Sequence, residues 1–223
     1  MELAQLAVFV RAPIAGSVKT RLHALLGPEG ATELYCAFVD DVVELCNRVQ
    51  EAGRVGVALW ADDADDPAVR RWAEALGTSP KQQADGDLGR RMTVAFEEGL
   101  AKVDRVVIIG SDAPTLPFGS IVSAFDRLAD VPLVLGPSND GGYYIIGASK
   151  APPRFDDVRW STEFAYQDTR VANSAVTLGT VPPWYDVDDE ADLDALRAHL
   201  SVSPAAASAT ATVLHRLRRA THR

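Results

Sequence analysis

The chain has 223 residues, of which 47% are hydrophobic and 24% are charged, a balance that suits one large α/β domain or two small ones. Its formal net charge is −9 and its isoelectric point is about 4.9. General binding to nucleic acid or to an anionic membrane needs a basic face, so both classes are disfavoured, whereas a locally basic phosphate pocket stays compatible.

The amino-terminal segment and the cysteines indicate a cytoplasmic protein. No basic leader precedes the apolar run at 6–10, and no window reaches the ~18 apolar residues that span a bilayer. Cys36 and Cys46 fall in one predicted helix, so about 15 Å separates them. We therefore expect free thiols, as in a reducing compartment.

Predicted strands and helices alternate along the first two thirds of the chain. A glycine-containing polar loop at 85–89 and a turn at 139–142 interrupt the pattern, and the turn predicts a hairpin-like excursion. The predicted strands are 6–10, 55–59, 105–109, 133–135, 143–146 and 176–181, and the predicted helices are 28–52, 67–77, 92–100, 118–128, 163–173 and 190–200.

This alternation favours a mostly parallel sheet with helices on both faces. In such sheets ligands bind beyond the carboxyl ends of the strands. The loops at 11–21, 110–114 and 136–142 all follow strands, so we expect them to share one rim. Residues 1–200 read as a single domain, and residues 201–223 read as an alanine-rich and then basic tail, either weakly helical or disordered.

The loop after the first strand combines cations with small residues. Lys19 and Arg21 can neutralise a diphosphate, and the small residues let backbone N–H groups approach phosphate oxygens. The spacing is neither that of a Walker A loop nor that of a G-x-G-x-x-G fingerprint. A solvated basic loop explains the composition equally well.

Two acidic motifs are candidates for a divalent metal site. Asp112 follows the most apolar strand, where a carboxylate can bridge a cation to a diphosphate, although a helix cap is the ordinary explanation. Asp186 and Asp188 open the run 186–192 and can complete the site. That run also suits the amino terminus of a helix, where carboxylates are stabilised by the dipole.

A third motif runs from Asp140 through Gly141 and Gly142 to Tyr143 and Tyr144. Its glycines permit close backbone approach or positive φ. Asp140 can act as a general base or bind an acceptor, and the tyrosines can line a sugar site. A tight turn without catalytic function is the competing interpretation.

Nucleophilic hydrolase chemistry is not indicated by the sequence. It contains no G-x-S-x-G motif. The four histidines lie outside the motifs, so we expect them to be surface residues.

In this order the motifs resemble a bacterial family of the GT-A glycosyltransferase superfamily, labelled arsenosugar-biosynthesis-type glycosyltransferase or nucleotide-diphospho-sugar transferase. The resemblance covers nearly the whole chain up to about residue 200. The matching segments are FVRAPIAGSVKTRL from Phe9, DLGRRM from Asp87, IGSDAPTLP from Ile109, LGPSNDGGYYIIG from Leu135, WST from Trp160 and DVDDEADL from Asp186.

The resemblance implies a GT-A (Rossmann-like) α/β three-layer sandwich with a mostly parallel, mixed central sheet, and it implies roles for residues. Nucleotide binding would fall to Arg11, Ala12, Pro13, Gly16, Lys19 and Arg21, with Asp87, Leu88 and Gly89 near the base or ribose. Asp140, Gly141, Gly142 and Tyr143 would form the acceptor-side loop. Asp112, Asp186 and Asp188 would bind the metal, and Asp140 and Asp112 would be catalytic.

One departure from the superfamily concerns the metal. Many GT-A enzymes carry an Asp-x-Asp, whereas Ala113 and Pro114 follow Asp112 here, so a further ligand must come from elsewhere. We expect a glycosyltransferase that uses Mg²⁺ or Mn²⁺, a nucleotide-diphospho-sugar donor and a small-molecule acceptor. The alternatives are a nucleotidylyltransferase similar to phospholactate or phosphoenolpyruvate guanylyltransferases, and a nucleotide-sugar-binding module without turnover.

Overall fold

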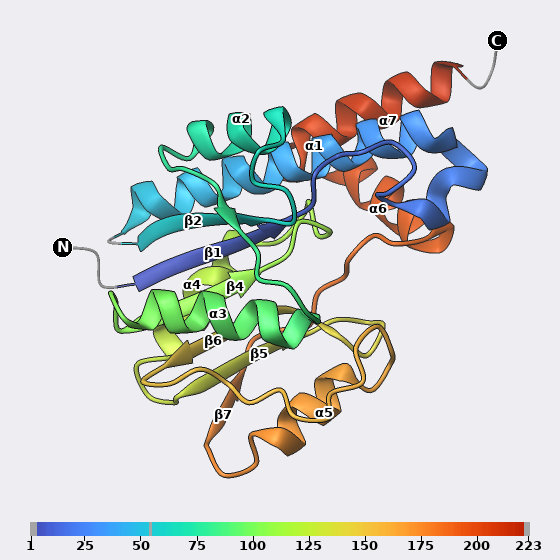
Figure 1. Ribbon diagram of the computed structural model, residues 1–223. Coiled ribbons are helices and arrows are strands. Elements are labelled where there is room, and N and C mark those ends of the chain that lie inside the picture. Colours follow the sequence, from blue (N-terminus) through green and yellow to red (C-terminus); the bar gives the residue numbers. More distant parts are fainter. Residues whose placement is uncertain (1–3, 54, 221–223) are drawn as a thin grey trace.

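The computed structural model describes residues 4–53 and 55–220, with the side chains of the last two left out. A mixed sheet lies between two layers of helices (Figure 1). Its strand order is β3-β2-β1-β4-β6-β5-β7. The strands are β1 (Ala4–Val10), β2 (Val55–Ala61), β3 (Lys81–Gln82), β4 (Arg105–Ile109), β5 (Leu133–Pro137), β6 (Tyr143–Ser149) and β7 (Leu178–Thr180).

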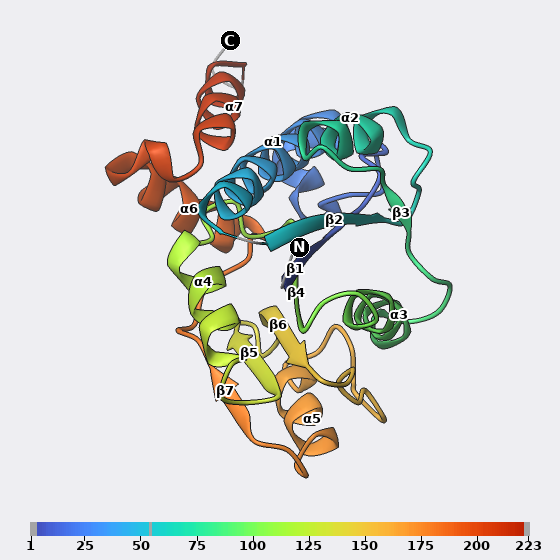
Figure 2. The ribbon, with the colours of Figure 1, turned by 90° about the vertical axis from the view of Figure 1, so that its left-hand side faces the viewer.

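Helices cover both faces of this sheet (Figure 2). Alternating residues of β1 place Leu6, Val8 and Val10 against α1, α2 and α4, and Ala7 on the opposite face with α3. The helices are α1 (His23–Ala52), α2 (Pro67–Ala75), α3 (Leu88–Leu100), α4 (Phe118–Arg127), α5 (Ala165–Ala172), α6 (Glu190–Val202) and α7 (Ser208–Ala220), and 3-10 turns lie at Thr20–Leu22 and Pro204–Ala206.

The chain order reverses around β1, which is the topological switch point of the sheet. β1 pairs in parallel with β2 on one side and with β4 on the other, whereas β6 runs antiparallel to β4 and pairs Ile145 with Ile109. The carboxyl ends of β1 and β4 and the beginning of β6 therefore meet at one edge. A ligand is expected at that edge.

The predicted fold class is confirmed: the protein is an α/β three-layer sandwich with a mixed sheet. Two local details differ from the sequence-based expectation. Leu88 and Gly89 belong to α3 rather than to a loop, because Asp87 caps that helix. Strand β3 was not predicted, since it has only two residues. Within α1, Gly27 has non-helical φ and ψ, so a short helical stretch from His23 precedes the break and the long helix begins at Pro28 as expected.

The carboxy-terminal segment forms a helix that packs on the domain. The side chain of Asp41 in α1 accepts hydrogen bonds from the backbone N–H groups of Ala209 and Thr210 at the start of α7. Leu214 of α7 is buried in a cluster with Leu34 and Phe38 of α1. Of the tail predicted at 201–223, residues 208–220 are therefore helical, and residues 221–223 lie outside the described part of the chain.

The structure also tests the expectations for the cysteines, for membrane-spanning helices and for the histidines. Both cysteines are free thiols. In the described part of the chain no helix is both long and apolar enough to cross a membrane. Of the histidines expected at the surface, His215 is exposed and His222 lies outside the described residues. His23 and His199 are half-buried instead: Nε2 of His23 lies 3.0 Å from the Val18 carbonyl oxygen, and Nδ1 of His199 lies 2.8 Å from the Tyr185 hydroxyl.

Candidate nucleotide and metal site

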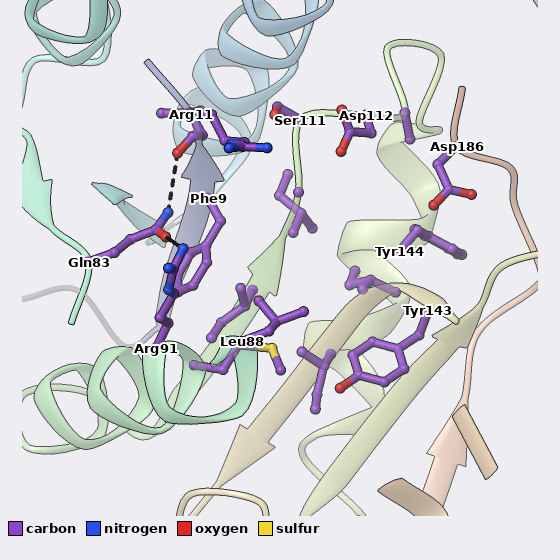
Figure 3. A pocket seen from close by; sticks show the side chains of 18 of the residues that line it. Phe9, Arg11, Gln83, Leu88, Arg91, Ser111, Asp112, Tyr143, Tyr144 and Asp186 are labelled. Atoms are coloured by element: carbon purple, nitrogen blue, oxygen red, sulfur yellow. Dashed lines mark hydrogen bonds between the residues drawn. The ribbon is translucent and has the colours of Figure 1, made fainter. Parts of the chain in front are cut away.

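A cavity of about 300 Å³ opens at the carboxyl edge of β1 and β4. Figure 3 shows Gln83, Leu88 and Arg91 at one end of it and Asp112 and Asp186 at the other. A second hollow of about 180 Å³ adjoins the acidic end and is lined by the cationic loop. Both hollows share Arg11, Tyr35 and Asp112. The loops at 11–21 and 110–114 therefore meet there, and the loop at 136–142 reaches the same end through Asp140, which lies beside Asp186.

The first loop is fixed by hydrogen bonds to its backbone. The N–H of Arg11 donates to the Tyr35 hydroxyl over 2.7 Å, and the N–H of Ala12 donates to Asp62 over 2.7 Å. The Tyr35 hydroxyl also lies 3.1 Å from the buried Ser111 hydroxyl. Burial, and then the charge of Asp112, raise the pKa of Tyr35, so it stays a neutral hydrogen-bonding group. Tyr35 thus couples the loop after β1 to the loop after β4.

Lys19 is not a free phosphate ligand in this arrangement. Its ammonium lies 2.5 Å from Asp112 and 2.9 Å from Asp188, and its side chain is only 4% exposed. It also donates to the carbonyl of Val187 over 2.7 Å, while the Val187 N–H donates to the carbonyl of Asp112 over 2.9 Å. Lys19 therefore ties the segment before α6 to the loop after β4.

Other cations of the loop are more accessible. The Arg11 side chain is 62% exposed and 3.4 Å from Asp62. Arg21 is exposed, lines the smaller hollow, and has no ion-pair partner among residues 4–53 and 55–220. Of the predicted neighbours, Ala12 is buried, Pro13 is half-buried and Gly16 is exposed with φ 89°. Arg11 and Arg21 are thus both exposed cations on the wall of the smaller hollow.

Three carboxylates converge at the acidic end. Single oxygen atoms of Asp140, Asp186 and Asp188 lie within 4.8 Å of one another, and no other group of three or more possible metal ligands is found in the described residues. Burial, and then the charges of Asp140 and Asp188, raise the pKa of Asp186 to about 6, although the Ser138 hydroxyl donates a hydrogen bond to it. Converging carboxylates of this kind suit a divalent cation.

Asp112 stands apart from that group. The predicted metal set of Asp112, Asp186 and Asp188 is brought to one end of the cavity, but Asp112 is engaged by Lys19 and does not join the three converging acids. Its side chain is 46% exposed and lies at the same end of the cavity as Asp186 (Figure 3). Asp140, predicted as a catalytic residue, takes its place beside Asp186 and Asp188.

The loop from Asp140 to Tyr143 has a backbone that requires glycine. Gly141 has φ 86°, and a Cβ there would lie 2.1 Å from the carbonyl oxygen of Glu163. The N–H of Gly142 donates to Asp140 over 2.8 Å, and the N–H of Tyr166 donates to the carbonyl of Gly141 over 3.0 Å. The turn is therefore held on the first turn of α5, and Asp140 is oriented by its own contact with Gly142.

The segment at 87–89 approaches the site mainly through Leu88, which lines the cavity and is 43% exposed. Asp87 caps α3 by accepting from the N–H of Arg90 over 2.8 Å. A Cβ on Gly89 would lie 2.9 Å from both Phe155 and Trp160, so Gly89 permits helix packing. Neither Asp87 nor Gly89 lines the cavity.

Sequence reasoning did not single out three residues of the cavity: Tyr35, Gln83 and Arg91. Gln83 lies just before the predicted polar loop, and Arg91 belongs to the DLGRRM segment, so the second could have been proposed from the resemblance. Gln83 carries no local signal, because its importance comes from bonds to the distant carbonyls of Val10 and Trp60.

Several known structures that resemble this chain are named as sugar or nucleotidyl transferases. Residues 45–162 match the family described as "Uncharacterized protein conserved in bacteria (DUF2064)". A Desulfovibrio desulfuricans G20 protein with a provisional assignment as a nucleotide-diphospho-sugar transferase is similar over 98% of both chains, at 30% identity and a TM-score of 0.86. No curated protein is a significant match.

Two more distant structures share the fold alone. CMP:2-keto-3-deoxy-manno-octonic acid synthetase complexed with CTP is 14% identical, with a TM-score of 0.57 over 89% of this chain and 98% of that chain. A cytidylyltransferase from Leptospira borgpetersenii serovar Hardjo-bovis is 12% identical, with a TM-score of 0.55 over 100% and 96%. The chain belongs to the DUF2064 family and has the GT-A-type α/β fold that nucleotide-diphospho-sugar and nucleotidyl transferases share.

Proposed function

We propose that the protein is a divalent-metal-dependent glycosyltransferase whose donor is a nucleotide-diphospho-sugar. The observation that carries the proposal is the cavity at the switch point, which is lined by Gln83 and Arg91 at one end and by Asp186 at the other, where Asp140 and Asp188 converge on Asp186. A nucleotide lying along it would place its diphosphate near Arg21 and the acids. The name of the Desulfovibrio protein supports this donor class.

Asp186 and Asp188 are the residues proposed to hold the cation, which is Mg²⁺ or Mn²⁺. Mg²⁺ is commonly bound by one or two carboxylates together with substrate phosphate oxygens, so two protein ligands suffice. The raised pKa of Asp186 fits this role, because a nearby cation would relieve the crowding of like charges. When bound, the ion would offset the charge that grows on the departing diphosphate.

Asp140 is proposed as the proton acceptor. It is exposed, has no cationic partner among the described residues, and is oriented by the N–H of Gly142. In the transfer step the acceptor hydroxyl oxygen bonds to the anomeric carbon, the bond from that carbon to the diphosphate breaks, and the hydroxyl proton passes to Asp140. The nucleoside diphosphate is the leaving group. Tyr143 lines the cavity from the same loop and is proposed to contact the sugar.

Lys19 and Asp112 are assigned supporting roles. Because Lys19 neutralises Asp112 and is bonded to the segment that carries Asp186 and Asp188, it is proposed to keep the acids in place rather than to bind phosphate directly. Asp112 keeps an exposed edge toward the cavity and can accept hydrogen bonds from donor hydroxyl groups.

The test is titration of nucleoside diphosphates by calorimetry, with and without Mn²⁺. Wild-type affinity should rise with Mn²⁺, and Asp186→Asn should abolish that rise. Asp104→Asn, an exposed acid beside the opposite end of β4, is the matched control. If Mn²⁺ does not change the wild-type affinity, the proposed metal dependence is wrong. If no nucleoside diphosphate binds, the proposed nucleotide donor is wrong.

A nucleotidylyltransferase is the second candidate, because the cytidylyltransferase named above shares the fold. Such an enzyme would release pyrophosphate from a nucleoside triphosphate. Only Arg21 is an unpaired cation of the first loop in the described structure, which favours a diphosphate over a triphosphate. Pyrophosphate release with a triphosphate and no turnover with nucleotide sugars would select this alternative.

A further inference from the structure

The end of the cavity opposite the acids contains a side-chain pair with fixed hydrogen-bonding roles. The Gln83 amide nitrogen donates to the carbonyl of Val10 over 3.2 Å and to that of Trp60 over 3.1 Å. Because both amide N–H donors are used, the orientation of the side chain is fixed. Its oxygen is directed to Arg91 and accepts from Nη1 over 3.2 Å (Figure 3).

Arg91 is held from two sides. Its Nε donates to the carbonyl of Gly86 over 3.1 Å, and its Nη1 donates to Gln83. A guanidinium has five N–H donors and no acceptor. The remaining N–H groups of Arg91 have no partner in residues 4–53 and 55–220, while the side chain lines the cavity. They are therefore available to a ligand from a preorganised position.

Several side chains beside Arg91 are apolar and cannot form hydrogen bonds with a ligand. Phe9, Leu88 and Met92 line the same end of the cavity and are apolar. A planar, largely apolar ring fits between such walls, and its polar edge would meet the N–H donors of Arg91. A guanidinium fork binds best to two adjacent acceptors.

We propose that Arg91 determines base specificity and favours a cytosine or guanine nucleotide, a refinement that rests on the proposed function. Cytosine presents O2 and N3 side by side, and guanine presents O6 and N7. In uracil an N–H separates the two carbonyl oxygens. Adenine places an amino group beside each ring acceptor of its polar edges, so one donor of the fork would meet a donor. Gln83 is the positioning residue for this fork.

The experiment compares the affinities of CDP, GDP, UDP and ADP by calorimetry in the presence of Mn²⁺. A bidentate guanidinium contact discriminates between bases by roughly 5- to 150-fold. Wild type should bind CDP or GDP more tightly than ADP within that range, with UDP between them. Arg91→Gln should reduce the ratio to near unity. Arg91→Lys, which keeps the charge but lacks the fork, should also lose most of the discrimination while it retains binding.

Arg90→Gln is the matched control, since Arg90 is the exposed neighbour on α3 and does not line the cavity. It should keep the wild-type preference. Equal affinity of wild type for all four nucleotides, a preference for ADP, or a preference that survives in Arg91→Gln would overturn the inference and leave the proposed function standing. Absence of binding to all four would overturn the proposed function and this inference with it.

Discussion

The Lys19 ammonium lies 2.5 Å from Asp112 and is almost completely buried between it and Asp188. Burial by itself would lower the pKa of Lys19, but the two carboxylates outweigh it and raise the pKa above its usual value. The residue is therefore charged at neutral pH. Composition suggests that Lys19 binds phosphate, but in the structure its charge is paired with Asp112 and Asp188.

Replacing Lys19 with Met should destabilise the protein. Removal of one partner from a fully buried ion pair costs about 3–5 kcal/mol. Asp112 and Asp188 are 46% and 42% exposed, so solvent screening reduces the expected loss to about 1–3 kcal/mol. Urea unfolding monitored by circular dichroism measures it. Arg21→Met, at an exposed position, should change stability by less than about 0.5 kcal/mol, and an unchanged midpoint for Lys19→Met would refute the anchoring role.

The acidic group predicts how pH controls metal binding. The folded pKa of Asp186 is raised from 3.8 to about 6. In metal-free protein this carboxyl therefore stabilises the fold in acid, and the contribution is lost as the pH rises from 3.8 to about 6. A cation requires the deprotonated carboxylate, so Mn²⁺ affinity should increase as the pH rises through about 6. Thermal unfolding across this range with and without Mn²⁺ checks both signs, and Asp186→Asn should flatten both dependences.

Asp41 offers a test of whether α7 belongs to the domain. Its carboxylate is 6% exposed and accepts from the N–H groups of Ala209 and Thr210 over 2.9 and 2.8 Å. Asp41→Ala should destabilise the protein by about 1–2 kcal/mol, the range for a lost helix cap. It should also speed amide hydrogen exchange in α7. Glu44→Ala, a substitution at an exposed position one turn further along α1, should change neither stability nor exchange. If Asp41→Ala and Glu44→Ala behave alike, α7 does not contribute to the stability of the domain.

Much of the fold could be predicted because its signals are local. The four β-branched residues from Val106 to Ile109 mark β4, and the acidic caps Asp66 and Asp189 stand at the starts of α2 and α6. The helix α7 could be given only as one of two alternatives. Its run of Ala, Ser and Thr has weak periodicity, and its position depends on contacts with α1 that are distant in sequence.

The candidate site was predicted at the level of loops but not of partners. The strand order brings the loops together, so Asp112, Asp140 and Asp186 could be expected on one rim. Which acid faces which depends on single long-range bonds, such as the one from the Val187 N–H to the Asp112 carbonyl. Gln83 and Arg91 were not identified as a pair for the same reason.

Gly141 should tolerate no side chain. Its φ of 86° disfavours any L-residue, and a Cβ would meet the Glu163 carbonyl at 2.1 Å. Gly141→Ala should therefore destabilise the protein by at least about 1–3 kcal/mol, as measured by thermal and urea unfolding. Gly119→Ala provides the control, because its Cβ would meet nothing within 4 Å in α4; it should be stabilising by about 0.5–1 kcal/mol. Comparable effects of the two substitutions would contradict the steric argument.

Asp140→Asn separates proton transfer from metal binding. Asparagine keeps an oxygen that can accept from the Gly142 N–H, so the turn and the fold should persist. The charge and the basicity are lost, and turnover with a nucleotide sugar should fall by about 10²–10⁴, the usual contribution of a positioned general base. Because Asp186 and Asp188 keep their carboxylates, Mn²⁺-dependent nucleotide affinity should change by less than about threefold, equivalent to roughly 0.6 kcal/mol. Calorimetry and initial-rate measurements on the same preparation give both values. If Asp140→Asn loses Mn²⁺ dependence as fully as Asp186→Asn does, Asp140 is a third ligand of the ion. If the turnover rate is unchanged, the role of Asp140 is limited to shaping the turn.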